Sequence, residues 1–138
     1  MTRPRGQIRP CSSGEARDRH DHALRFLEAA ELVLEDTTQS GYSNVAGALA
    51  VLAGVAIADA VCCRALGRHH HGADHGAAVG LLSRVAGVGE RMSRDLDRLL
   101  GIKDKASYQS GYLSRADARR AVEWARRMIG DGSAVLAG

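Results

Sequence analysis

A run of fourteen uncharged residues, Val45–Ala58, constrains the fold of this chain more than any other feature. A helix that spans a bilayer needs about 20 apolar residues, whereas a run of 10–14 is more typical of a buried helix. The expected helix, 42–66, has small and apolar residues on nearly all of its faces. Such a helix packs closely against several neighbours. We therefore expect a central helix of a bundle and no membrane span.

Apolar residues at three- and four-residue steps predict the neighbouring helices over 14–36, 75–100 and 115–129. The second segment has a lower helix propensity because it contains Gly80, Gly87 and Gly89. A bend or break near Gly87 is therefore expected. Ser114 followed by Asp117 has the pattern of a helix N-cap.

No segment alternates apolar and polar residues convincingly, so no strand is expected. The predicted fold is all-α, an up-and-down bundle of four to five helices over residues 14–130. Arginines, two prolines and the lack of periodicity predict a disordered basic tail over 1–13. Residues 131–138 are expected to form a flexible C-terminal tail.

Charge and cysteine content limit the function classes only weakly. A formal net charge of +3 allows binding of RNA or phosphate without requiring it. Cys11, Cys62 and Cys63 are odd in number, and two are adjacent, so a disulfide framework is not expected. The polar, basic N-terminus has no apolar run behind it, as a secretory signal would have. These features predict a cytoplasmic protein.

The segment Leu99–Tyr108 contains the only two lysines, Lys103 and Lys105, with Asp104 between them and Tyr108 shortly after. It is predicted as a polar loop between two amphipathic helices, where a phosphate or RNA site could lie. On the following helix Arg119 and Arg120 lie about two turns from Arg126 and Arg127. This ridge is either an electrostatic surface for RNA backbone or a solvated helix face.

A second polar segment, 67–74, contains His69, His70 and His71. Imidazoles are common metal ligands, but consecutive side chains of a flexible loop point apart, which favours a solvated loop and no metal or cofactor. Asp74 is expected to cap the next helix, with His75 in its first turn as a structural residue more than a catalytic one. Asp59, in the apolar helix, needs a partner. An arginine of a neighbouring helix is expected, and a functional carboxylate is the alternative.

The chain resembles the HEPN superfamily, small helical-bundle proteins named for nucleotide binding in higher eukaryotes and prokaryotes. The similarity covers about Ala16–Ile129 and rests on five segments: Phe26–Leu32, Ala58–Ala60, Asp74–His75, Leu100–Tyr108 and Ser114–Ala118.

Many HEPN proteins are metal-independent endoribonucleases with an arginine, a polar residue and a histidine near the start of the last helix, four to six residues lying between the arginine and the histidine. The resemblance places Lys103, Asp104 and Tyr108 at these positions, so the motif is degenerate. Lysine can neutralise a phosphate, but tyrosine is a poor general base near neutral pH. The resemblance therefore implies a domain that binds RNA, a nucleotide or a protein partner with little or no ribonuclease activity. The binding residues would be Lys103, Asp104, Lys105, Tyr108, Arg119 and Arg120.

Two alternatives remain open. One is a toxin-like endoribonuclease that uses an arginine and a histidine from the region Arg64–His75, with Arg64, Arg68 and His75 as candidates. The other is a structural or antitoxin-like interaction module. The resemblance also implies a homodimer, and it allows a nucleotidyltransferase-type antitoxin as a partner.

Overall fold

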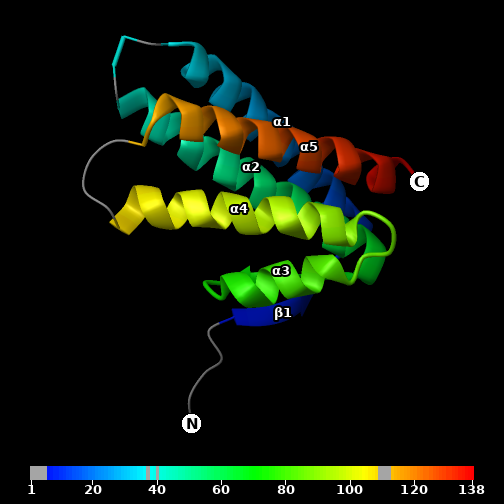
Figure 1. Cartoon of the computed structure of the whole chain (residues 1–138). Helices are drawn as coiled ribbons and strands as arrows, with labels where there is room; N and C mark the ends of the chain where they lie inside the picture. The colour runs from blue at the N-terminus through cyan, green and yellow to red at the C-terminus, as the bar shows by residue number, and fades with distance from the viewer. Residues whose placement is uncertain (1–5, 37, 40, 109–112) are drawn as a thin grey trace.

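A computed structural model describes residues 6–36, 38–39, 41–108 and 113–138, except for the side chains of 6–7 and 106–108. These residues form five helices and one two-stranded sheet. The helices are α1 (Ser13–Glu35), α2 (Gly41–Leu66), α3 (His75–Ser83), α4 (Gly89–Tyr108) and α5 (Arg115–Ala137). The strands are β1 (Gly6–Pro10) and β2 (Arg68–Gly72). The expected all-α bundle is confirmed, with a small sheet added at one end (Figure 1).

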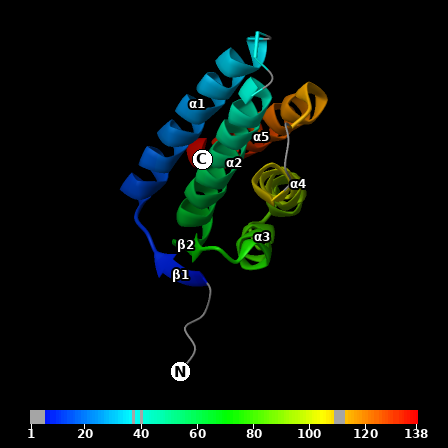
Figure 2. The same ribbon diagram turned by 90° about the vertical axis from the view of Figure 1, so that its left-hand side faces the viewer.

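Helix α2 is the centre of the bundle, as its apolar run predicts. It packs mainly against α1 and α5, and then against α4. By length and composition α2 could cross a membrane, but 61% of its most apolar window is buried inside the protein. Figure 2 shows α1 and α2 side by side, with α3 and α4 seen nearly end-on beside them.

Close approach between helices depends on glycine at a few positions. A Cβ atom on Gly54 of α2 would lie 2.5 Å from Leu99 Cδ1 of α4. A Cβ atom on Gly132 of α5 would lie 2.7 Å from Ile57 Cγ1 of α2. Real side chains do not tolerate such distances, so these glycines set the spacing between the helices.

The helix boundaries follow local signals in the sequence. Ser114 Oγ accepts a hydrogen bond from the amide of Asp117 (3.0 Å), and Asp74 Oδ1 accepts one from Ala77 (3.0 Å). Both caps were expected. The predicted break near Gly87 separates α3 from α4, and Gly87 has a φ of 85°, which glycine adopts readily.

Four expectations about local structure are wrong. Part of the expected basic tail, Gly6–Pro10, forms β1, which pairs antiparallel with β2 in the register Gly6↔Gly72 to Pro10↔Arg68. The histidine segment is therefore a strand, although no strand was expected. The expected loop around Lys103 is the end of α4, and the expected flexible tail at 131–138 mostly continues α5 to Ala137.

Candidate functional site: a cleft beside helix α2

A cleft of about 470 Å³ lies between α2, β2, α3 and α4. Its volume is in the range of small-molecule sites, roughly 300–1,000 Å³. Most of its lining is aliphatic, including Val51, Val55, Leu81, Leu96 and Leu100. A lining of this kind accepts an apolar group or the flat face of a ring.

The polar residues of the lining are Lys103, Asp59, His70, His71 and His75. Lys103 follows Ile102, which lies near the Gly47 end of α2, while Asp59 lies twelve residues further along α2. At 1.5 Å per residue the two positions are about 18 Å apart along the helix axis. The cleft thus has a cation at one end and a carboxyl group with histidines at the other.

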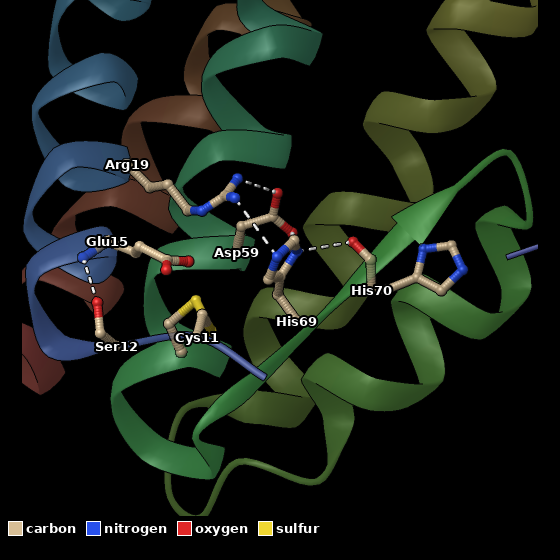
Figure 3. The surroundings of a disulfide bond; sticks show 8 residues. Cys11, Ser12, Glu15, Arg19, Asp59, His69 and His70 are labelled. Carbon is tan, nitrogen blue, oxygen red and sulfur yellow. Dashed lines mark hydrogen bonds and ion pairs between the residues drawn. A yellow bond between two sulfur atoms is a disulfide. The ribbon is translucent and has the colours of Figure 1, made fainter. Parts of the chain in front are cut away.

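Asp59 is held by the ion pair that its position in an apolar helix predicts. Arg19 Nη1 of α1 donates to Asp59 Oδ2 at 3.2 Å, and His69 Nδ1 lies 3.9 Å from Asp59 Oδ1 (Figure 3). Burial raises the pKa of Asp59 to about 6, although the charge of Arg19 opposes this shift. Asp59 can therefore gain or lose a proton near neutral pH.

The alternation of side chains along β2 separates His69 from His70. His69 is buried on the side of Arg19, where Arg19 Nη2 lies 3.4 Å from its Nε2 and the carbonyl of His70 lies 3.1 Å from its Nδ1. Burial lowers the pKa of His69 and favours the neutral ring. His70 lines the cleft, and its buried Nε2 has no hydrogen-bond partner among the described residues.

The residues predicted to bind RNA do not gather at one site. Lys105 and Arg120 both donate to Asp117, each at 2.7 Å, and these bonds lower the pKa of Asp117 to about 2. Arg119 and Asp104 are exposed, and the side chain of Tyr108 lies outside the described residues.

The predicted arginine ridge on α5 is largely neutralised. Arg127 Nη2 donates to the buried Asp95 at 2.7 Å, and Arg126 Nη2 donates to Glu31 at 3.3 Å. With Arg120 held by Asp117, three of the four arginines of the ridge are paired with carboxylates. The ridge thus presents less unpaired positive charge to an RNA backbone than the sequence suggests.

The alternative arginine and histidine candidates are also dispersed. Arg64 Nη2 donates to the carbonyl oxygen of Gly138 at 2.7 Å. Arg68 lies in β2, and its buried Nε has no hydrogen-bond partner among the described residues. Of the three candidates, His75 alone lines the cleft, and no described hydrogen bond or ion pair joins it to Arg64 or Arg68.

The expectation that the chain has no disulfide is wrong for this structure. Cys11, directly after β1, is bonded to Cys63 near the end of α2, with 5.5 Å between the Cα atoms. Pairing of β1 with β2 brings these distant residues together, and the sequence contains no local signal for it. Cys62 stays free in the cleft wall, and burial raises the pKa of its thiol to about 12, which disfavours the nucleophilic thiolate.

Fold and site together define a small helical-bundle protein with a mostly apolar cleft that carries cationic and titratable groups. Comparison with family models, with curated proteins and with solved structures gave no match.

Proposed function

We propose that this protein is a non-catalytic, HEPN-like binding domain that holds a nucleotide in the α2 cleft. The nucleotide is a free nucleoside monophosphate or the end of an RNA chain. The observation that carries this proposal is that Lys103 and His75, which are far apart in the sequence, line one cleft.

The lining of the cleft suits the two parts of a nucleotide. Aliphatic side chains such as Val55 and Leu96 can enclose the faces of a base, as apolar side chains do for flipped bases. The polar edge of the base can bond to the Asp59 carboxyl group or to the unpartnered Nε2 of His70. Lys103, which forms no ion pair with any described residue, supplies a charge for the phosphate.

The same contacts argue against ribonuclease activity. Cleavage requires a charge-stabilising cation and a proton-transfer group close to one phosphate. In the cleft Lys103 lies about 18 Å along α2 from Asp59. Outside it Arg64 is held by Gly138, and Lys105 and Arg120 are held by Asp117. The domain therefore binds its ligand and leaves the phosphodiester bond intact.

Calorimetric titration with adenosine and uridine 5′-monophosphates at low salt tests this proposal. We expect one molecule bound per chain, and an affinity at least tenfold lower in Lys103→Gln, because the phosphate loses its counter-charge. Arg119→Gln removes a similar charge from the exposed face of α5 and should change the affinity less than twofold.

Two outcomes would overturn this function. If neither nucleotide binds, or if Arg119→Gln weakens binding as much as Lys103→Gln, the cleft is not the site. If the wild-type protein cuts a short RNA in the presence of EDTA and His75→Ala does not, the endoribonuclease alternative is correct.

A protein partner is a second candidate, favoured by the exposed apolar side chains of α2. Leu52 is 46% exposed and Val55 is 37% exposed, both in the cleft lining, and Val45 on the same helix is 46% exposed. A homodimer would cover them. Sedimentation should then show a dimer that dissociates in Leu52→Glu and persists in Leu32→Glu, a change at an exposed site on α1. A wild-type monomer would exclude this homodimer.

A further inference from the structure

The disulfide lies within a cluster of metal-ligand side chains outside the cleft lining. Ligand atoms of Cys11, Glu15 and His69 all lie within 4.8 Å of one another, and Cys63 is bonded directly to Cys11. Figure 3 shows the side chains of Glu15 and His69 beside Cys11, where α1, α2 and β2 meet. One sulfur, one imidazole and one carboxylate thus form the cluster, and the Cys63 sulfur joins it through its bond to Cys11.

We propose that, when the Cys11–Cys63 disulfide is reduced, Cys11, Cys63, His69 and Glu15 bind one zinc ion. Two thiolates with imidazole and carboxylate form a donor set that suits tetrahedral Zn²⁺. Zinc–ligand bonds of about 2.0–2.3 Å place ligand atoms roughly 3.3–3.8 Å apart. The atoms of Cys11, Glu15 and His69 therefore need to approach by only about 1 Å, while the two sulfurs separate.

The environment of His69 suits a ligand. Its side chain is 7% exposed, and its Nδ1 lies 3.1 Å from the carbonyl of His70, the partner that orients many zinc-binding histidines. Nε2 then carries the free electron pair. Arg19 Nη2 now lies 3.4 Å from this atom and would give it up to zinc, while Arg19 Nη1 stays bonded to Asp59.

Disulfide and zinc are alternative states of the same two sulfurs. Reduction adds two electrons and two protons to the S–S bond, and a phosphine reductant supplies the electrons and becomes a phosphine oxide with oxygen from water. Zinc then displaces the two thiol protons. In either state the two cysteines hold β1 to the end of α2. The disulfide suits an oxidising compartment, and the zinc site suits a reducing one.

Zinc binding to the full chain tests this proposal, with and without tris(2-carboxyethyl)phosphine. After gel filtration, elemental analysis should find one zinc per reduced chain and none per oxidised chain. Cobalt in place of zinc should give the intense visible absorption of a tetrahedral site and the near-ultraviolet band of a thiolate ligand. Cys11→Ser and Glu15→Gln, both at positions that are not fully buried, should each lower zinc affinity at least tenfold.

Matched controls separate this site from other thiols and histidines. Cys62→Ser removes the neighbouring free thiol and His71→Ala removes an exposed imidazole of the same strand, and both should bind zinc as the wild type does. The proposal is overturned if the reduced chain takes up no zinc or if the oxidised chain binds it equally well. It is also overturned if both Cys11→Ser and Glu15→Gln keep wild-type affinity.

Discussion

Among single residues, Asp59 connects the core of the protein with the cleft. Its carboxyl group lines the cleft, yet it belongs to the most apolar helix and depends on one arginine from α1. Burial of the charge outweighs the attraction of Arg19, so the pKa rises from 3.8 to about 6. The folded chain therefore keeps a proton over a pH range in which the unfolded chain has lost it.

The stability of the fold should reflect this difference. As the pH rises from about 4 to 6, the folded state binds more protons at Asp59 than the unfolded state, so the Asp59 contribution to the free energy of unfolding decreases. The free energy of unfolding of the wild type relative to Asp59→Asn should fall by about 2–3 kcal/mol between pH 4 and pH 7. Urea unfolding at several pH values measures it, and a difference that stays constant would contradict the raised pKa.

At the scale of helices and strands, local signals predict the elements that depend on local chemistry. The caps at Ser114 and Asp74 and the break at Gly87 are confirmed because neighbouring residues determine them. The strands were missed because β1 and β2 pair across about 60 residues of chain, and three consecutive histidines give no apolar alternation. The extension of α5 to Ala137 is not predicted from the sequence; within it Gly132 packs against Ile57, a tertiary contact that no local signal encodes.

Two glycine substitutions separate the effects of tertiary packing and of helix propensity on the free energy of unfolding. A Cβ atom on Gly54 would overlap Leu99, which is fully buried, so Gly54→Ala should lower the free energy of unfolding by about 1–3 kcal/mol. A Cβ atom on Gly80 of α3 meets nothing within 4 Å, so Gly80→Ala should raise stability by about 0.5–1 kcal/mol. Chemical denaturation measures both, and equal effects would show that packing at Gly54 is loose.

At the scale of the whole molecule, the candidate site is assembled from four elements. Lys103 and His75 were each singled out from the sequence, but their presence in one cleft depends on how α3 and α4 pack against α2. No residue spacing encodes that arrangement. The pairing of Lys105 with Asp117 likewise depends on the approach of α4 to α5, whereas Arg120 pairs with Asp117 within α5, three residues away.

The disulfide should contribute to the stability of the whole chain. It joins residues 52 positions apart, and in the chain-entropy model a loop of this length stabilises the fold by about 4 kcal/mol. Reduction in the presence of EDTA should lower the free energy of unfolding by up to that amount. The reductant should have no such effect on Cys11→Ser, and an equal loss in that variant would assign the effect to another cause.

The position of the bound nucleotide tests the central claim most directly. In amide NMR spectra of the ¹⁵N-labelled chain, titration with adenosine 5′-monophosphate should shift the signals of Lys103, Asp59, His70 and His75 together, with one dissociation constant. Signals of Arg119 and Arg120 should stay in place. Shifts confined to the arginine face of α5, or no shifts at all, would contradict the assignment of the α2 cleft as a nucleotide site.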